Sequence, residues 1–179
     1  MEQLSKDEMR RFLHAAKDAT NVPAWFHLAL KVGFYHGLRV SEIVGLMADN
    51  FQDGNLVVQR CKGSKKTVQP LISSDDPVLD ERQAMIDYLV HQPFNQPLFK
   101  CSTRHFMRLV DKVGALAGLP KHKRITKILK QTCGRQLCET MPINYVQTWL
   151  GHVKLSSTGA YTRVSDEEAA EKSVPALSL

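Results

Sequence analysis

The sequence predicts a mainly α-helical protein with one small antiparallel β-sheet. Over most of the 179 residues, apolar side chains recur at the spacing of amphipathic helices. Clear β segments occur only at residues 56–60 and 67–72, where β-branched and apolar residues alternate with polar ones. Residues 62–65, between these segments, contain the glycine and serine of a hairpin turn. Pro70 indicates that the second strand lies at a sheet edge.

The N-terminal part of the chain is expected to form three helices. Residues 5–8, Ser-Lys-Asp-Glu, have the pattern of a capping box, and apolar spacing continues to about residue 18. Residues 25–36 are apolar almost all round, which is typical of a buried helix, and Gly37 stands at its C-cap position. A short helix is expected over residues 40–47.

The remaining helices are expected over residues 78–90, 103–117, 126–140, 143–150 and 155 to about 162, with a short extended segment at 97–99. The sequence contains no internal repeat, low-complexity run or domain linker. A chain of this length can bury one compact core. We therefore expect a single domain over residues 1–164, followed by a C-terminal tail over residues 165–179.

Composition and motifs argue against several classes of protein. No apolar run reaches the roughly 20 residues needed to cross a bilayer, and the N-terminus lacks the pattern of a signal peptide. We therefore expect a cytoplasmic protein without a membrane partner. The four cysteines lack zinc-site spacing, so reduced thiols and no metal site are expected. Neither a P-loop nor a GxGxxG motif occurs, so no cofactor is expected.

Positive charge is concentrated in two clusters, within a net charge of +6. The first contains Arg60, Lys62, Lys65 and Lys66, and the second contains Lys121, Lys123, Arg124, Lys127 and Lys130. The second cluster has no acidic residue between positions 121 and 130. A single charge run is usually a solvated face. Two such clusters beside the motifs described next favour binding to a phosphate backbone.

The first motif is the segment GLRVSEIVGL at residues 37–46. Arg39 follows a glycine turn and precedes a predicted helix start. Its guanidinium is a rigid fork of donors that matches two phosphate oxygens, and the helix N-terminus adds to the attraction for an anion. Glu42, one helical turn later, can orient Arg39. The alternative for Glu42 is an ordinary surface ion pair, which contributes little.

The second motif is a Gly-His pair, Gly151-His152, that precedes Tyr161 by nine residues from the histidine. Alone, such a pair is more often a packing feature than a catalytic one. Together, the Arg39 segment, the Lys62 hairpin, the basic helix and this pair occur in a fixed order. In that order the chain resembles the catalytic domain of tyrosine recombinases, the phage integrase family.

The resemblance implies a reaction in which Tyr161 attacks a DNA phosphate and forms a 3′-phosphotyrosyl intermediate. Arg39 would hold the scissile phosphate, and His152 would bond its non-bridging oxygens. Lys62 would protonate the leaving 5′ hydroxyl, because an alkoxide is a poor leaving group. Lys65 or Lys66 can substitute for Lys62 or bind the DNA backbone instead. No metal or high-energy cofactor is implied.

The chain departs from the family pattern on the predicted helix over residues 126–140. Lys127 and Lys130 stand where the family usually has histidine and arginine, and Gln131 stands where another histidine is common. Lysine keeps the charge but lacks the planar fork. Losing one preorganised donor costs roughly 3–4 kcal/mol of transition-state stabilisation. Tyrosine also needs a base or dense positive charge, and a lysine with a lowered pKa can be that base.

The expected function is therefore site-specific DNA recombination: integration, excision or inversion. Expected partners are double-stranded DNA and three further copies of the chain on paired sites, with a monomer when free, in a bacterial, archaeal or phage-infected cell. The expected DNA-contacting residues are Arg60, Lys65, Lys66, Lys121, Lys123 and Arg124. Two alternatives stay open: a DNA-binding regulator with a weakened site, and relaxation of DNA in the manner of type IB topoisomerases.

The chain starts directly at the region that resembles the catalytic domain. Most family members carry a helical domain ahead of it that closes around the DNA. The short recombinases of DNA-inversion switches are similar to this chain in that respect. We expect weaker and more salt-sensitive DNA binding, because fewer phosphate contacts release fewer counterions.

Overall fold

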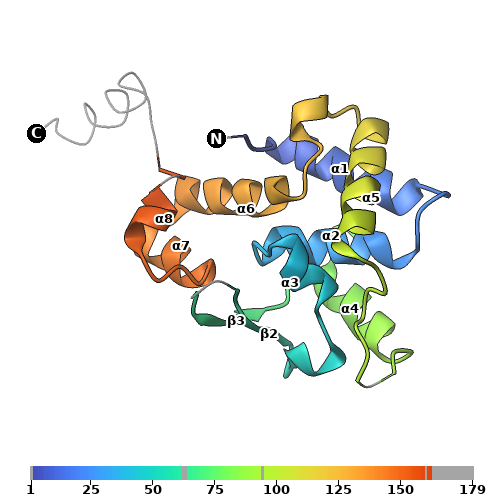
Figure 1. The fold of residues 1–179 in the computed structure, drawn as a ribbon, viewed down its shortest axis with the longest axis horizontal. Helices are drawn as coiled ribbons and strands as arrows, with labels where there is room; N and C mark the ends of the chain where they lie inside the picture. The colour runs from blue at the N-terminus through green and yellow to red at the C-terminus, as the bar shows by residue number, and fades with distance from the viewer. Residues whose placement is uncertain (1, 62–63, 94, 160, 163–179) are drawn as a thin grey trace, which may run out of the picture.

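The structure is a computed structural model that describes residues 2–61, 64–93, 95–159, 161 and 162. Helices make up most of this part of the chain, and a small sheet lies at one side of the molecule (Figure 1). The elements in order are α1 (Lys6–Asp18), α2 (Trp25–Tyr35), α3 (Val40–Val44), η1 (Ala48–Asn50), β1 (Phe51–Gln52), β2 (Asn55–Gln59), β3 (Lys66–Pro70), α4 (Glu81–Leu89), α5 (Thr103–Leu116), η2 (Lys121–Lys123), α6 (Lys127–Thr140), α7 (Ile143–Trp149) and α8 (Leu155–Gly159).

The predicted class, mainly helical with a small antiparallel sheet, is confirmed. The sheet has the order β1-β2-β3, and both strand pairs are antiparallel. β3 is therefore an edge strand, as Pro70 indicated. The short strand β1 was not expected, because two residues are too few for an alternating pattern. The end of the predicted domain beyond residue 162 and the predicted tail, residues 165–179, lie outside the described residues.

Three helices are shorter than expected. α8 ends at Gly159 instead of about residue 162, and local hydrogen bonds end or delay the other two. α3 stops at Val44 instead of residue 47, since Met47 begins a new turn in which its N–H donates to Asn50 Oδ1 at 2.8 Å. α4 begins at Glu81 instead of residue 78. Asp76 Oδ1 accepts from the Val78 N–H at 2.9 Å, and this bond stabilises a turn ahead of the Asp80 N-cap.

α1 begins with the predicted capping box. The Ser5 N–H donates to Glu8 Oε2 at 2.8 Å, and the Glu8 N–H donates to Ser5 Oγ at 3.1 Å. These bonds satisfy two of the amides that a helix N-terminus leaves without partners. Just before this cap, the Leu4 N–H donates to Thr132 Oγ1 at 2.9 Å. That bond attaches the start of the chain to α6.

The core is built around α2, which contacts α1, α3, α4 and α6 and crosses the middle of the molecule in Figure 1. Its apolar residues pack against aromatic side chains of other elements, such as Phe26 against Phe106 with ring centroids 5.3 Å apart. A second, smaller cluster contains Cys133, Val146, Leu150 and Tyr161. Phe34 packs against both clusters. The second cluster thus joins α6, α7 and the segment after α8 to the main core.

Gly37 ends the turn after α2 at a φ of +57°, as expected for a C-cap glycine. The Leu38 N–H closes this turn on the Gly33 carbonyl at 2.9 Å. A Cβ at position 37 would lie 2.5 Å from Leu150 Cδ2. Glycine is required here by both the backbone angle and the contact with Leu150. Arg39 follows two residues later.

Within the described residues, no helix combines the length and apolar character needed to cross a membrane.

The capping box predicts a specific stability effect. We expect Ser5→Ala to lower the free energy of unfolding by about 1 kcal/mol, because the Glu8 amide loses its acceptor. Urea denaturation measures this change. Ser73→Ala, at an exposed position, is the control and should change stability by less than about 0.5 kcal/mol. Equal stability of the two variants would contradict a capping role for Ser5.

Candidate active site

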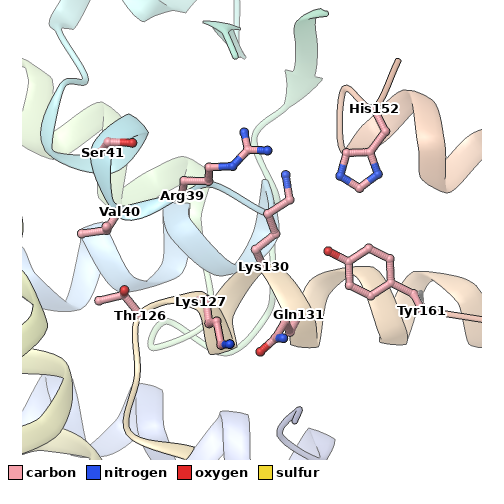
Figure 2. A pocket seen from close by; sticks show the side chains of 9 residues that line it. All are labelled: Arg39, Val40, Ser41, Thr126, Lys127, Lys130, Gln131, His152 and Tyr161. Atoms are coloured by element: carbon pink, nitrogen blue, oxygen red, sulfur yellow. The ribbon is translucent and has the colours of Figure 1, made fainter. Parts of the chain in front are cut away.

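A pocket of about 500 Å³ lies between the start of α3, the start of α6 and the segments that follow α7 and α8. Its lining residues are Arg39, Val40, Ser41, Thr126, Lys127, Lys130, Gln131, His152 and Tyr161 (Figure 2). The fold therefore brings together five of the six residues predicted to act in catalysis. The sixth, Lys62, lies outside the described residues.

Arg39 is held at the pocket by Glu42. The Arg39 N–H donates to Glu42 Oε2 at 2.8 Å, and Arg39 Nη1 donates to Glu42 Oε1 at 3.2 Å. Arg39 Nη1 also lies 3.4 Å from the Cys61 carbonyl. The Arg39 side chain is 32% exposed, whereas that of Glu42 is 1% exposed. The buried carboxylate of Glu42 thus fixes the guanidinium of Arg39, which is open to the pocket. This is the contact predicted for Glu42.

Glu42 stays ionised although it is buried. Burial raises the pKa of its carboxyl group, but backbone N–H donation from Arg39 and Cys61 and the charges of Arg60 and Lys130 lower the pKa below its ordinary value. The Cys61 N–H donates to Glu42 Oε1 at 2.9 Å. Hydrogen bonds to the charged form offset the cost of removing this carboxylate from water.

Arg60 corrects a prediction, because it does not contact solvent and so cannot bind the DNA backbone as expected. Its side chain is 0% exposed. The side chains of Leu56 and Val58 on β2 are buried, and the two-residue period of a strand places Arg60 on the same inward face. All of its donor atoms bond within the protein, to Thr67, Gly37, Glu42, His36, Gln69 and Trp149. The charged residues that follow Arg60 in the sequence hide this alternation of inward and outward positions.

Lys127 and Lys130 lie three residues apart on α6, and both line the pocket. Lys127 is exposed, whereas Lys130 is 8% exposed and its Nζ has no hydrogen-bond partner among the described residues. In Figure 2, Lys130 reaches the same side as Arg39 and His152, whereas Lys127 extends the other way with Gln131. Burial, together with the charges of Arg39 and Arg60, lowers the pKa of Lys130 to about 8.

His152 follows a tight turn that packs against the β-hairpin. Gly151 has a φ of +68°, and a Cβ there would lie 2.9 Å from the Lys65 carbonyl oxygen. The Lys65 N–H donates to the Gly151 carbonyl at 2.9 Å. His152 Nδ1 is 2.9 Å from Thr158 Oγ1. Burial, followed by the charges of Lys130, Arg39 and Arg60, lowers the pKa of His152 to about 4, so the imidazole is neutral near neutral pH.

Tyr161 stacks on His152, with ring centroids 6.2 Å apart and planes 7° from parallel. On α6 the ring lies against Gly134, where a Cβ would be 3.0 Å from three ring atoms. Figure 2 shows the hydroxyl directed toward the side of the pocket where Lys130 and Gln131 lie. Burial raises the pKa of Tyr161 above its ordinary value, and Arg39 acts in the opposite direction. The phenol is therefore protonated at neutral pH.

The other predicted DNA-contacting residues lie outside the pocket lining. Lys65 and Lys66 are exposed on the hairpin. Lys121 pairs with Asp111 on α5 at 2.8 Å, and Lys123 pairs with Glu8 on α1 at 2.8 Å. The Arg124 Nε donates to the Leu119 carbonyl at 2.7 Å. Local sequence gave no sign of these acidic partners, because they lie on other helices.

Among the described residues, no group of three or more His, Cys, Asp or Glu side chains could hold a metal ion. The charged residues that line the pocket, Arg39, Lys127 and Lys130, are all cationic. Their chemistry suits an anion.

The chain matches the phage integrase family over residues 2–168. It belongs to this family. The resemblance based on the Arg39, Lys62, His152 and Tyr161 motifs is thereby confirmed, although that match assigns no role to an individual residue.

Curated relatives in the family include tyrosine recombinases of archaea and bacteria. The XerA protein of Thermococcus kodakarensis is 29% identical over 176 residues, which cover 92% of this chain and 58% of the relative. The XerA protein of Pyrococcus furiosus is 32% identical over 142 residues, which cover 75% of this chain and 49% of the relative. The chain thus spans about half to three fifths of the length of these relatives.

Solved structures share the fold. A crystal structure of XerA recombinase aligns with a TM-score of 0.75 at 24% identity, and the alignment covers 100% of this chain and 66% of that chain. The catalytic domain of bacteriophage HP1 integrase aligns with a TM-score of 0.65 at 20% identity, and the alignment covers 96% of this chain and 94% of that chain. The predicted likeness to a tyrosine recombinase catalytic domain is confirmed at the level of the fold.

The lowered pKa of His152 predicts acid sensitivity. The unfolded chain takes up the histidine proton near the ordinary pKa of 6.5, but the folded protein does so only near 4. Stability from the neutral imidazole is therefore complete above about pH 6.5 and is lost as the pH falls toward 4. We expect the stability advantage of wild type over His152→Asn to shrink between about pH 7 and about pH 4.5. Urea denaturation across this range measures it.

His27, whose pKa is also lowered to about 4, is present in both proteins, so its contribution cancels in the comparison. A constant difference in stability across the pH range would show that His152 titrates normally.

Proposed function

We propose that this chain carries the catalytic site of a site-specific DNA recombinase, which cuts and rejoins DNA through a phosphotyrosyl intermediate. The observation that supports this most is the pocket itself, in which Tyr161 lies with Arg39, Lys130 and His152. A buried tyrosine beside fixed cations suits attack on a bound anion once the phenol has lost its proton. A phosphodiester of double-stranded DNA is an anion of the right kind.

The proposed reaction exchanges one phosphate ester for another. The Tyr161 oxygen bonds to phosphorus, and the bond from phosphorus to the 5′ oxygen of the next nucleotide breaks. The phenol passes its proton to a base in the pocket, for which a neutral lysine is the predicted group, and the leaving 5′ oxygen gains a proton. Lys62 stays the predicted donor of that second proton. Because an ester bond is kept throughout, the reverse reaction rejoins DNA without ATP.

Each pocket residue has a role that follows from its charge. Arg39, fixed by Glu42, presents donors to the non-bridging phosphate oxygens. Lys130 supplies an ammonium whose partner in the complex is the phosphate, and this partner raises the pKa of Lys130 from about 8. His152 is neutral, so it adds a hydrogen bond but no charge. Lys127, more exposed, is assigned to the same phosphate or the flanking backbone.

The proposal that the chain is a recombinase also implies which partners it has. A related structure shows XerH recombinase bound to its difH substrate, and another shows a lambda integrase tetramer bound to a Holliday junction. We propose that this chain likewise acts on paired DNA sites as a tetramer and is a monomer when free. Action on DNA places it in the cytoplasm of a bacterial, archaeal or phage-infected cell. The arrangement of the sites then determines integration, excision or inversion.

A second candidate is a DNA-binding regulator with a weakened site. Lys127, Lys130 and Gln131 favour it, because none of them supplies the planar donor fork or the imidazoles that the family usually has at these positions. In that case the fold would bind duplex DNA but transfer no phosphoryl group. Relaxation of DNA in the manner of a type IB topoisomerase is the remaining alternative.

The proposed chemistry predicts a covalent protein–DNA adduct that depends on Tyr161. The substrates are nicked suicide duplexes that cover the DNA flanking the gene, and denaturing electrophoresis detects the adduct. Wild type should form it, and Tyr161→Phe should lose it while binding duplex DNA with unchanged affinity. Tyr145→Phe is the matched control, since Tyr145 is 57% exposed and outside the pocket lining. It should form adduct as wild type does.

The other outcomes separate the alternatives. Duplex binding without any adduct in wild type would overturn the recombinase proposal in favour of a regulator. An adduct together with relaxation of a plasmid that lacks paired sites would favour the topoisomerase-like activity.

A further inference from the structure

Arg60 lies behind the candidate active site and connects three segments of the chain. Its guanidinium lies within hydrogen-bond distance of six acceptors, so at least one of its five N–H groups is shared between two of them. The acceptors belong to the turn between α2 and α3 together with Glu42 on α3, to strand β3 and to the end of α7. The resemblance assigned Arg60 no catalytic role, and its burial excludes the DNA contact expected from the sequence.

The first connection is to the turn that leads to Arg39. Arg60 Nη2 donates to the His36 carbonyl at 2.6 Å, and Nη1 donates to the Gly37 carbonyl at 3.2 Å. Nη1 also donates to Glu42 Oε2 at 3.3 Å. The Glu42 carboxylate therefore stands between the two guanidiniums, with Arg60 on the buried side and Arg39 on the pocket side.

The second connection is to the turn that leads to His152. Arg60 Nη2 lies 3.4 Å from the Trp149 carbonyl and 3.2 Å from Gln69 Oε1. Gln69 Nε2 in turn donates to the same Trp149 carbonyl at 2.9 Å. Arg60 Nε donates to Thr67 Oγ1 at 3.0 Å. β3 is thereby fixed against the end of α7, three residues ahead of His152.

From these contacts we infer that Arg60 is a positioning residue, which holds the Arg39 turn and the His152 turn at the separation that one phosphate requires. This inference rests on the proposed function of the pocket. Arg39 and His152 are 113 positions apart in the chain, and Arg60 bonds directly to the backbone next to both. Arg60 itself touches no substrate, because it is buried.

The chemistry of the side chain suits this role. A guanidinium has five N–H donors in a fixed plane, so it can set the relative position of several acceptors. An ammonium has three donors around one point and cannot span the same acceptors. A purely structural cation would need no connection to the two turns that carry Arg39 and His152. Stability alone is therefore the competing explanation, and the test must separate it from positioning.

The decisive measurement is the cleavage rate constant of folded, DNA-saturated protein, well below the melting temperature. We expect Arg60→Met to lower this rate constant by about 10²-fold, as when a reacting group moves by about 1 Å. The Kd for duplex DNA should stay close to that of wild type, since exposed cations dominate backbone affinity. A folded Arg60→Met that cleaves at the wild-type rate would overturn the inference.

Arg60→Lys separates the effect of geometry from that of charge. The same variant tests the inference if Arg60→Met does not fold. It keeps the buried charge but not the planar fork. We expect cleavage to fall while the pKa of His152 stays low, because charge on the Arg60 side chain is among the causes that lower it. Wild-type cleavage by Arg60→Lys would show that the fork does not position the site.

Lys31→Met is the matched control. Lys31 is another fully buried cation, and its Nζ donates to the Asp80 carbonyl at 2.6 Å, outside the pocket lining. Its charge contributes to the lowered pKa of His27. We expect Lys31→Met to raise the pKa of His27, to leave that of His152 unchanged and to keep the wild-type cleavage rate constant. Loss of cleavage in this folded variant would show that removal of any buried cation suffices, which contradicts positioning by Arg60.

An NMR titration of the histidines keeps this inference separate from the proposed function. Arg60→Met should raise the pKa of His152 from about 4, with the His152 signal assigned by its loss in His152→Asn. This readout needs no DNA. If wild type forms no adduct, the recombinase proposal fails, and the titration still decides whether the charge of Arg60 lies close enough to act on His152. An unchanged pKa in Arg60→Met would overturn that part of the inference.

Discussion

The carboxylate of Glu42 lies between two guanidiniums and accepts four hydrogen bonds, two from Arg39, one from Arg60 and one from the Cys61 amide. The pocket is assembled around this single buried negative charge. Without it, Arg39, Arg60 and Lys130 would repel one another in a region of low dielectric constant. Removing one partner of such a buried network leaves uncompensated charge, which is strongly destabilising. The position of Arg39 and the burial of Arg60 both depend on Glu42.

One carboxylate does not balance the surrounding positive charge, and the excess adds to the effect of burial on the pKa values of the pocket. The pKa values of Lys130 and His152 are both lowered, and burial acts together with the neighbouring cations in each case. Burial is also the largest cause of the shift at Tyr161, but it raises the pKa there because the charged form of a phenol is an anion. The free protein thus holds a neutral imidazole and a protonated phenol beside fixed cations. Such an arrangement is complementary to an anion.

Local patterns in the sequence predicted those features that neighbouring residues determine. The Ser5–Glu8 capping box, the Gly37 turn and the edge position of β3 follow from a few adjacent side chains. Family motifs predicted that Arg39, Lys127, Lys130, His152 and Tyr161 meet, although Lys127 and Gln131 extend away from the Arg39 guanidinium in the pocket view. In contrast, the partners of Lys121 and Lys123 are Asp111 and Glu8. No local pattern indicates such pairs, because the tertiary fold brings them together.

Arg60 shows the same limit more clearly. Its charge suggested a surface position, but the alternation of β2 that continues through Leu56 and Val58 placed it inside. Here the hydrophobic periodicity predicts the burial of Arg60 better than its charge does. Successive side chains of a strand point to opposite faces of the sheet, whatever the side chain is. The acceptors that make burial of this charge possible come from β3 and from the ends of α2 and α7. They are apparent only once the chain is folded.

The ammonium of Lys130 is buried and has no hydrogen-bond partner within the described part of the chain, and this affects the free protein in solution. Burial and the charges of Arg39 and Arg60 outweigh the attraction of Glu42, so the charged ammonium raises the free energy of the folded state. Any small anion that enters the pocket offsets this effect and stabilises the fold by mass action. The melting temperature therefore rises as a larger fraction of the protein has an anion in the pocket. Buffers that differ only in phosphate or sulfate content are then not interchangeable when the stability of this protein is compared between preparations.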